Sequence, residues 1–290
     1  MTDPGAAELA VVIVNYNTGE YLERCLASLE ACRGDIETDV LVIDNASRDG
    51  SHTRAAVAHP RTRLIENPTN VFLSPAWNQG IRETKAPFVL LLNPDTEWRT
   101  GTLADYVRIA REHPRAGIVG PLIRNPDGTV YPSGRPFPGV FDAAAHAFLG
   151  TVAPRNRATR RYHLDGWDRA TEREVDWVSG ACMLLPRSAF DEVGLLDEAF
   201  LLYGEELDLA TRLHAAGWQV LFTPEVEVVH AIGVSTGRSR RMLRMHSASI
   251  YRYYRKHRAA GWRRITLPIA WVILRLRAEI EGLRTRVAAR

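Results

Sequence analysis

Acidic side chains follow apolar runs at several points of this chain, and the clearest case is at residues 89–95. Val89–Leu92 is apolar and leads directly into Asn93, Pro94 and Asp95. A buried strand that ends in a carboxylate brings it to the edge of a sheet, where α/β proteins bind their ligands. The alternative is a plain turn, because asparagine, proline and aspartate all favour turns. Asp95 is therefore the first candidate for an acid that binds a ligand.

A second group of carboxylates stands within four positions, at Glu205, Glu206 and Asp208. We expect these acids at the start of a helix that ends at Gly217, where the helix dipole favours negative charge. Helix capping explains only one of them, and a solvated acidic first turn is the alternative to a functional cluster. His230 follows the last expected strand, a context that suits a ligand, although a lone histidine is often structural.

Short apolar segments alternate with amphipathic ones over the first 92 residues, as in a parallel sheet with crossover helices. No GxGxxG motif follows the first strand and no GxxxxGK[ST] motif occurs, which argues against dinucleotide dehydrogenases and P-loop NTPases. The expected strands are Leu9–Val14, Val40–Ile43, Arg63–Glu66 and Val89–Leu92, and the expected helices are Tyr21–Leu29, Thr53–Ala58 and Ala76–Thr84.

The second half of the chain is less regular. Residues 132–175 hold many prolines and arginines with weak periodicity, so we expect a long mobile segment that serves as a lid or substrate loop. The other expected elements are a helix over Leu103–Arg111, a hairpin turn at 125–128 between strands Gly117–Ile123 and Thr129–Tyr131, a strand from Val175 through Leu185, a helix after Ser188, and final strands Trp218–Thr223 and Glu225–Val229.

The composition is that of a globular protein, with 290 residues and 46% hydrophobic content. Three cysteines without a CxxC pair predict reduced thiols in a cytosolic setting. The first residues are acidic where a signal peptide would be basic. The nearest candidate for a membrane span, Ile265–Leu274, is too short and is interrupted by Thr266 and Pro268.

Positive charge is concentrated at the C-terminal end. Residues 235–290 contain 15 Lys and Arg against 2 acids, whereas residues 1–234 contain 22 against 32. The basic residues are interleaved with tyrosine and tryptophan and bound the apolar Ile265–Leu274 run, a pattern that favours an interfacial helix on anionic lipid. An internal packing helix and a nucleic-acid surface are the alternatives, and we expect no nucleic-acid partner.

Four motifs in order make the chain resemble a family 2 glycosyltransferase with a GT-A fold: VVIVNYN at 11–17, VIDNASRDGS at 42–51, LLNPDT at 91–96 and GEELDLATRL at 204–213. VDWVSGACMLLPR at 175–187 and YRYYRKH at 251–257 are similar to the rhamnosyltransferase branch that extends polyprenyl-diphosphate-linked sugars.

The resemblance implies an α/β fold with a mostly parallel central sheet. It divides the chain into a catalytic domain at 1–234 and a basic, helical, membrane-associating extension at 235–290. Within the catalytic domain, the nucleotide-sugar half would span about 1–120 and the acceptor half about 121–234.

The same resemblance implies an inverting transfer that depends on Mg²⁺ or Mn²⁺, bound by Asp95 with His230 as a second ligand. Glu206 takes the position of the general base, with Glu205 and Asp208 as alternatives. Arg212 would neutralise the donor diphosphate, or simply pair with Asp208 one helical turn away.

The remaining implied site residues bind the two substrates. For the donor, Asp44 would accept the N3–H of a pyrimidine, Tyr16 would pack on the base and Val14 would line the pocket. The other donor-binding residues would be Asn78, Asn93, Asp95 and Arg212, and the acceptor-binding residues Trp177, Gly180, Tyr254, Lys256 and His257.

The chain departs from the family pattern at three places. Asn93 stands where an acid is usual, Glu206 stands where aspartate is usual, and Asn70-Val71-Phe72 lacks the usual glycine. The favoured donor is dTDP-L-rhamnose, with UDP-hexose or UDP-galactofuranose as alternatives. The expected acceptor is a polyprenyl-diphosphate-linked N-acetylglucosamine on the inner face of the cell membrane. A catalytically inactive scaffold that binds nucleotide sugars is the alternative from another class.

Overall fold

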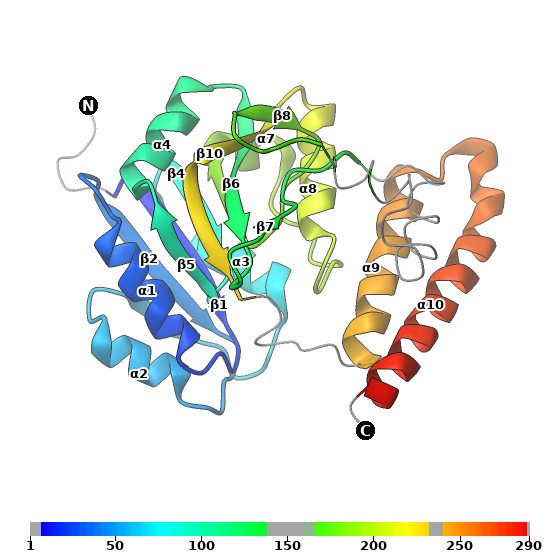
Figure 1. The fold of residues 1–290 in the computed structure, drawn as a ribbon, viewed down its shortest axis with the longest axis horizontal. Helices are drawn as coiled ribbons and strands as arrows, with labels where there is room; N and C mark the ends of the chain where they lie inside the picture. The colour runs from blue at the N-terminus through cyan, green and yellow to red at the C-terminus, as the bar shows by residue number, and fades with distance from the viewer. Residues whose placement is uncertain (1–6, 138–159, 161–163, 165, 232–239, 289–290) are drawn as a thin grey trace.

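One sheet organises the chain up to residue 230. The computed structural model describes residues 7–137, 160, 164, 166–231 and 240–288. Within them the strands follow the order β3-β2-β1-β4-β9-β6-β10-β5, with β7 added to β6 and β8 added to β10 (Figure 1).

The first four strands are parallel, as expected from the alternation of strands and helices. They are β1 (Leu9–Asn15), β2 (Thr38–Asp44), β3 (Arg63–Glu66) and β4 (Phe88–Leu92). All seven residues of β1 are buried, because helices cover both faces of the sheet.

Alternate residues of β1 enter two different hydrophobic cores, as the two-residue period of a strand requires. Leu9, Val11 and Ile13 belong to one core, and Val12 and Val14 belong to the other. The first core includes residues of α1 (Tyr21–Ala31), α2 (Ser51–Ala58) and α4 (Leu103–Glu112), and the second includes residues of α3 (Leu73–Arg82), α7 (Arg187–Val193) and α8 (Glu205–Ala215).

The second half of the sheet mixes directions. β9 (Cys182–Pro186) runs antiparallel to β4 and β6 (Ala116–Arg124), while β10 (Gln219–His230) runs parallel to β6. β5 (Thr96–Thr100) pairs antiparallel with the end of β10. We did not predict β5, because Glu97 and Arg99 break any apolar run and the preceding Asn-Pro-Asp resembles a turn.

Two expected strands differ in extent from the observed ones. The two predicted C-terminal strands form the single strand β10, with a register shift between Thr223 and Glu227 that accommodates Pro224. The segment predicted as one strand from Val175 to Leu185 divides into β8 (Arg173–Val175) and β9.

The hairpin between β6 and β7 (Val130–Tyr131) is confirmed. The Asn125 amide donates to the Thr129 carbonyl at 2.8 Å, the Gly128 amide donates to the Asn125 carbonyl at 2.9 Å, and Gly128 has φ 82°. Most of the segment expected to be mobile, 132–175, lies outside the described residues. Its described end packs on the sheet, where the Trp167 ring lies 4.7 Å from that of Phe222.

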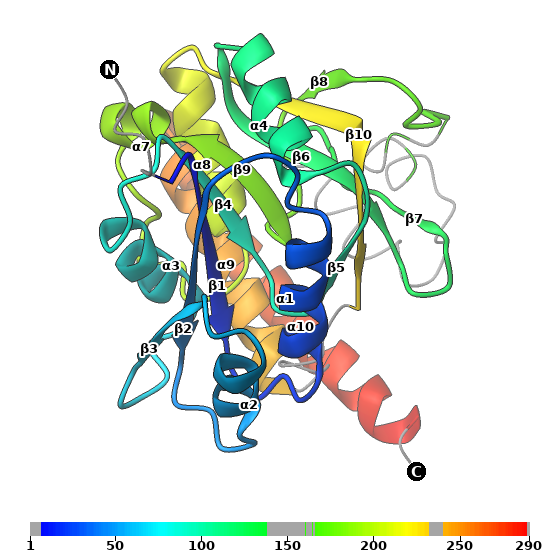
Figure 2. The ribbon, with the colours of Figure 1, turned by 90° about the vertical axis from the view of Figure 1, so that its left-hand side faces the viewer.

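The C-terminal extension forms a helical hairpin, α9 (Arg240–His257) and α10 (Leu267–Ala288), joined by the 3₁₀ helix η1 (Gly261–Thr266). It lies beside α8, on the side of the sheet opposite α1 and α2 (Figure 1). Tyr253 of α9 is 2% exposed and belongs to the second core. The C-terminal end of α10 projects below the sheet in Figure 2. Among the described residues, no helix combines the length and apolar content needed to cross a membrane.

Candidate functional site

The predicted site residues of β1, β2 and β4 meet at one edge of the sheet. β1 pairs in parallel with both neighbours, with Asn15 opposite Asp44 and Ile13 opposite Leu92. The carboxyl ends of these strands therefore lie side by side, and Asp95 follows three residues after the end of β4.

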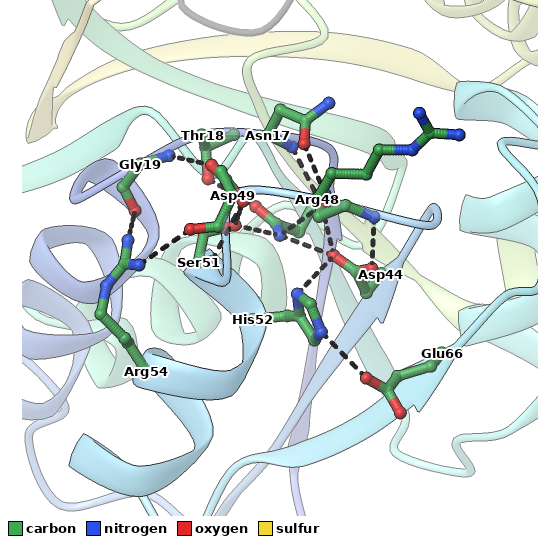
Figure 3. A network of polar contacts seen from close by, with 12 residues as sticks. Asn17, Thr18, Gly19, Asp44, Arg48, Asp49, Ser51, His52, Arg54 and Glu66 are labelled. Carbon is green, nitrogen blue, oxygen red and sulfur yellow. Dashed lines mark hydrogen bonds and ion pairs between the residues drawn. The ribbon is translucent and has the colours of Figure 1, made fainter.

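Asp44 is buried, and donors from three sides fix its carboxylate. Asn15 Nδ2 donates to Oδ1 at 2.7 Å, Ser47 Oγ donates to the same oxygen at 2.6 Å, and the Ser47 amide donates to Oδ2 at 2.8 Å. His52 lies behind it, with Nδ1 3.6 Å from Oδ1 and Nε2 3.0 Å from a Glu66 oxygen (Figure 3). Because Oδ2 accepts a single one of these hydrogen bonds, it has capacity for one more N–H donor.

The loops around this carboxylate are braced by two residues that sequence reasoning missed. Asn15 is fully buried and also donates to Ser51 Oγ at 2.9 Å. Asp49 accepts from the Gly19 amide at 2.8 Å and so joins the loop after β1 to the loop after β2 (Figure 3). Asn15 was detectable as the polar residue that ends a buried run. Beside these loops, Tyr16 is 37% exposed, so its ring is available to a ligand.

Asp95 and His230 face each other across the β5–β10 pair. His230 stands opposite Thr96 in the ladder, and its Nε2 lies 3.1 Å from Asp95 Oδ1 and 3.3 Å from Asn93 Nδ2. Both side chains are nearly buried, and His230 Nδ1 has no hydrogen-bond partner. The β10 strand therefore delivers the histidine that sequence context singled out to the acid after β4.

A carboxylate oxygen and an imidazole nitrogen fit a Mg²⁺ or Mn²⁺ ion. In the described part of the chain, no group of three or more His, Cys, Asp or Glu side chains could hold a metal. Asp95 and His230 thus supply at most part of a coordination sphere, and phosphate oxygens of a bound nucleotide would have to complete it.

The two glutamates at the start of α8 have raised pKa values. Burial is the main cause for both, and in Glu205 the neighbouring charge of Glu206 raises the pKa further. Glu205 is 3% exposed and its Oε2 has no hydrogen-bond partner, whereas Glu206 is partly exposed and accepts from the Gly204 amide at 3.0 Å. A carboxylate with a raised pKa at the edge of a site is typical of a general base.

The dipeptide Gly180-Ala181 connects the acids at the start of α8 with the Asn93–Asp95 segment. The Ala181 carbonyl accepts from the Asn93 amide at 2.9 Å. A Cβ atom built on Gly180 would lie 3.7 Å from Glu206 Cβ, in ordinary contact. The chain between β8 and β9 therefore places Glu206 on one side of this dipeptide and the start of the Asn93–Asp95 segment on the other.

The surroundings of Asp208 favour a structural role over that of the base, which was one of our alternatives. It is fully buried and accepts from His257 Nε2 at 2.7 Å, from Arg212 Nε at 2.9 Å and pairs with Lys256 Nζ at 2.7 Å. Burial alone would raise its pKa, but the hydrogen bonds from His257, Lys256 and Arg212 outweigh it and lower the pKa to about 2. Asp208 is an ionised anchor of the α8–α9 interface.

The same contacts involve three residues for which the resemblance implies roles in substrate binding, and for Arg212 they match the alternative of a pair with Asp208. Arg212 pairs with Asp208 on its own helix, and its other nitrogens donate to the carbonyls of Val193, Gly194 and Leu195 at 2.7–3.1 Å. It is therefore committed to the protein rather than to a diphosphate. Lys256 and His257 bind Asp208 and so hold α9 on α8.

Other predicted substrate residues also have internal partners. Asn78 Nδ2 donates to the Leu196 carbonyl at 2.9 Å, and Asn78 Oδ1 accepts from the Leu196 amide at 3.1 Å, so this side chain ties α3 to the 195–200 loop. The Tyr254 hydroxyl lies 2.6 Å from Thr266 Oγ1 in η1. Trp177 is 7% exposed and donates from Nε1 to the Pro136 carbonyl at 3.0 Å.

Arg135 is a residue beside the site that sequence reasoning missed. Its guanidinium lies 5.2 Å from the centre of the Tyr131 ring and 5.1 Å from that of Trp177. Its positive charge opposes the effect of burial on the pKa of Glu206. The segment 131–135 carried no periodic pattern, so nothing in the sequence pointed to it.

The mixed sheet, with a buried acid at the end of β2 and an Asp-His pair after β4, has the GT-A glycosyltransferase fold, as its likeness to solved structures shows. A mannosyltransferase from Pyrobaculum calidifontis, solved with GDP-Man and Mn²⁺, has a TM-score of 0.60 at 17% identity, covering 98% of this chain and 76% of that one. GalNAc-T7, solved with UDP, GalNAc and Mn²⁺, also gives 0.60 at 16% identity, covering 86% of this chain and 48% of that chain, so this chain spans less than half of it. The predicted α/β fold is confirmed.

The glycosyl transferase family 2 profile matches residues 10–194. The N-acetylglucosaminyl-diphospho-decaprenol L-rhamnosyltransferase of Mycobacterium tuberculosis is 37% identical over 277 residues, covering 91% of this chain and 89% of that protein. The chain belongs to glycosyltransferase family 2 and is a glycosyltransferase. The resemblance inferred from the motifs, including its rhamnosyltransferase-like branch, is confirmed.

Proposed function

We propose that this enzyme transfers L-rhamnose from dTDP-L-rhamnose to a polyprenyl-diphosphate-linked N-acetylglucosamine. The observation that carries the proposal is the 37% identity to a relative named for that acceptor and sugar, sustained over 91% of this chain. The match is too long to be confined to residues 1–234, so it includes part of the α9–α10 extension. The choice of dTDP as the donor nucleotide rests on the contacts of Asp44 and the exposure of Tyr16.

The end of β1 and β2 provides a place for a pyrimidine base. Asp44 Oδ2 has capacity for the N3–H of thymine, and the exposed ring of Tyr16 can pack on the base beside Val14. Asp95 and His230 would hold Mg²⁺ or Mn²⁺ next to the diphosphate. When bound, the ion supplies positive charge that stabilises the leaving group.

Glu206 acts as the general base. As the acceptor oxygen forms its bond to the anomeric carbon and the bond from that carbon to the diphosphate breaks, Glu206 receives the hydroxyl proton. A single displacement of this kind inverts the anomeric centre. The usual aspartate is one methylene shorter, and the amide of Gly204 holds the longer glutamate side chain by its carboxylate.

We further propose a peripheral location on the inner face of the cell membrane, with residues 235–290 as the membrane-associating part and 1–234 as the catalytic domain. Support comes from the excess of basic residues in that extension and from the apolar side chains that α10 exposes, including Ile269 and Leu276. Since α9 also packs on α8, α10 is the part of the extension free to meet lipid.

The test is nucleotide release from dTDP-rhamnose with a polyprenyl-diphosphate-GlcNAc analogue, with Mg²⁺ or Mn²⁺ and with a chelator. Release that requires both the acceptor and the metal supports the proposal, and inverted product stereochemistry would support the single displacement. Asp95→Ala should abolish release, while Glu97→Ala, the next acid along the chain, should retain it. Release of UDP from a UDP-sugar without dTDP release would reject rhamnose, and dTDP binding without release would favour an inactive scaffold.

A further inference from the structure

A cavity of about 490 Å³ lies between α9, α10 and the loop that leads into α8. The loop contributes Ala199 and Leu201, and the two helices contribute most of the remaining wall. Leu201, Met245, Trp271 and Leu274 make part of this wall apolar. The cavity is separate from Asp44 and Asp95, because no residue of β1, β2 or β4 lines it.

Four arginines line the same cavity: Arg244, Arg252, Arg255 and Arg275. Arg244 is neutralised by Glu279 at 2.7 Å. In the described part of the chain the other three have no carboxylate partner. Arg252 and Arg275 instead lie over aromatic rings, 5.9 Å from Phe200 and 4.9 Å from Trp271. Guanidinium groups bind phosphate oxygens in a bidentate manner, so this wall suits a phosphate or diphosphate.

The cavity adjoins the proposed base. Ser249 lines it and donates to the Leu202 carbonyl at 2.9 Å. A Cβ atom built on Gly204 would lie 3.7 Å from Ser249 Cβ, and the Gly204 amide donates to Glu206 Oε2 at 3.0 Å. One residue therefore separates the wall of the cavity from the carboxylate that would deprotonate an acceptor.

We propose that this cavity binds the diphosphate and the first prenyl units of the lipid-linked acceptor. The three arginines without carboxylate partners contact the diphosphate, the apolar wall contacts the prenyl chain, and the sugar extends past Gly204 toward Glu206. The identity of this ligand rests on the proposed function. These arginines, rather than Lys256 and His257, would bind the acceptor, because Lys256 and His257 contact Asp208.

The first test measures binding of farnesyl diphosphate to the full-length protein, without any sugar donor. Arg252→Gln and Arg275→Gln should each weaken binding about tenfold or more, because each removes a charge-assisted contact. Trp271→Ala should weaken binding as well. The matched control is Arg241→Gln, an exposed arginine of α9 outside the cavity, which should leave binding unchanged. Thermal unfolding checks that every variant folds.

Two comparison ligands separate the parts of the site. Farnesol and inorganic pyrophosphate should each bind more weakly than farnesyl diphosphate, because each lacks one half of the ligand. Equal affinity of the wild type and the Arg252→Gln, Arg275→Gln double variant for farnesyl diphosphate would overturn the proposal. The proposal would also be overturned if the arginine variants lost binding to phosphatidylglycerol vesicles but still bound farnesyl diphosphate, since the arginines would then recognise ordinary lipid headgroups.

Kinetics distinguish this inference from the proposed function. With the lipid-linked acceptor, the double variant should raise KM for the acceptor at least tenfold and leave KM for dTDP-rhamnose unchanged. A rise in the donor KM instead would overturn the assignment of the cavity. If the wild type transfers no rhamnose, the proposed function fails, and the farnesyl diphosphate measurements still decide whether the cavity binds a prenyl diphosphate.

Discussion

Glu205 and Glu206 are adjacent in the chain, yet their surroundings assign them different states. Glu205 is buried with an oxygen that lacks a partner, and burial raises its pKa well above the ordinary value. A buried carboxyl without a counter-ion is more stable when protonated. Glu206 is partly exposed, is held by the Gly204 amide and feels the charge of Arg135. These contacts therefore favour Glu206, rather than Glu205, as the residue that exchanges a proton.

Replacing each glutamate by glutamine tests this difference. Glu206→Gln should lower kcat by about 10²–10⁴-fold, the usual contribution of a general base, without changing dTDP binding. Glu205→Gln should have a much smaller effect, because burial favours the neutral acid at this position and glutamine resembles it. Glu206→Asp should retain part of the activity. Steady-state kinetics with the lipid-linked acceptor measure all three, and a larger loss for Glu205→Gln would transfer the role of base to Glu205.

The raised pKa of Glu206 sets the direction of the pH profile. A base must be ionised, so kcat should rise with pH through the pKa of Glu206 and level off above it. Because that pKa is raised, activity should fall at a higher pH than an ordinary glutamate would give. The acid limb should move in Glu206→Asp and stay in place in Asp49→Asn. An acid limb that is the same in wild type and Glu206→Asp would contradict the assignment.

Asp208 illustrates the opposite shift. Its pKa is lowered from 3.8 to about 2, so the stability it provides is fully present above about pH 4 and is lost as the pH falls through 2. The shift corresponds to roughly 2 kcal/mol. Asp208→Asn should lower the free energy of unfolding by about 3–5 kcal/mol, because it leaves Arg212 and Lys256 without their buried counter-ion.

Urea unfolding at neutral pH measures this loss. Glu112→Gln, which removes the exposed partner of Arg108 at 2.9 Å, is the matched control and should change stability by less than about 1 kcal/mol. Similar effects of the two substitutions would show that the Asp208 cluster contributes no more than a surface ion pair.

At the scale of elements, the turn into α3 holds a strained residue. Phe72 has φ 69° and ψ −173°, a region that essentially only glycine occupies. Three hydrogen bonds hold the turn: Asn45 Nδ2 to the Phe72 carbonyl at 3.0 Å, the Phe72 amide to Asn70 Oδ1 at 2.8 Å, and the Leu73 amide to the Leu201 carbonyl at 3.0 Å. The segment Asn70-Val71-Phe72, which lacks the usual glycine, thus contains a residue whose backbone conformation would suit glycine.

Comparing Phe72→Gly with Phe72→Ala isolates that strain, since both substitutions remove the ring. The glycine variant should be the more stable by about 1 kcal/mol, because relief of 1–3 kcal/mol of strain exceeds the entropy that glycine loses on folding. At Val71, whose φ is not positive, the order should reverse. Thermal or urea unfolding of the four variants checks this, and equal stability of the Phe72 pair would mean that the turn is not strained.

The strands and helices that could be predicted are those whose own residues determine them. β1 and β4 are continuous apolar runs, and α4 has apolar spacing with Thr102 and Asp105 forming its capping box. β5 could not be predicted, because Thr96–Thr100 becomes a strand only through pairing with β10.

Some site residues could likewise be predicted from the local sequence, and others could not. Asp44, Asp95 and His230 could be singled out from their place at strand ends. The contacts of Asp208 with His257 depend on α9 packing against α8, between segments about 50 residues apart, and no local pattern contains them. The Arg212–Asp208 pair, in contrast, is local and was one of the two alternatives that their spacing predicted.

In the whole molecule, the two helices of the C-terminal extension have different surroundings. They correspond to two of the alternatives that the sequence left open, an internal packing helix and an interfacial helix. α9 is the internal packing helix, with Tyr253 in the core and Lys256 bound to Asp208. α10 packs mainly on α9 and exposes an apolar stripe. Its members follow a spacing of three and four residues along one face of the helix: Ile269, Val272, Leu276 and Ile280, which are 62%, 48%, 53% and 46% exposed.

This stripe should bind anionic membranes. Exposed Arg264 and Arg275 lie in the same region, and basic residues beside an apolar helix face are typical of an interfacial helix. Ile269→Glu and Leu276→Glu should each weaken binding to phosphatidylglycerol vesicles by at least about tenfold, because each removes an apolar side chain from the lipid and adds repulsion. Val57→Glu is the matched control, since Val57 is 78% exposed on α2, across the sheet from α10.

Sedimentation with vesicles, at low and high salt, measures this binding. High salt should weaken it only in part, because the charge contribution is screened while the apolar one is not. Transfer to a water-soluble acceptor should be unchanged in Ile269→Glu, because that side chain does not line the cavity or the Glu206 site. Vesicle binding that survives both α10 substitutions would place the membrane contact elsewhere on the enzyme.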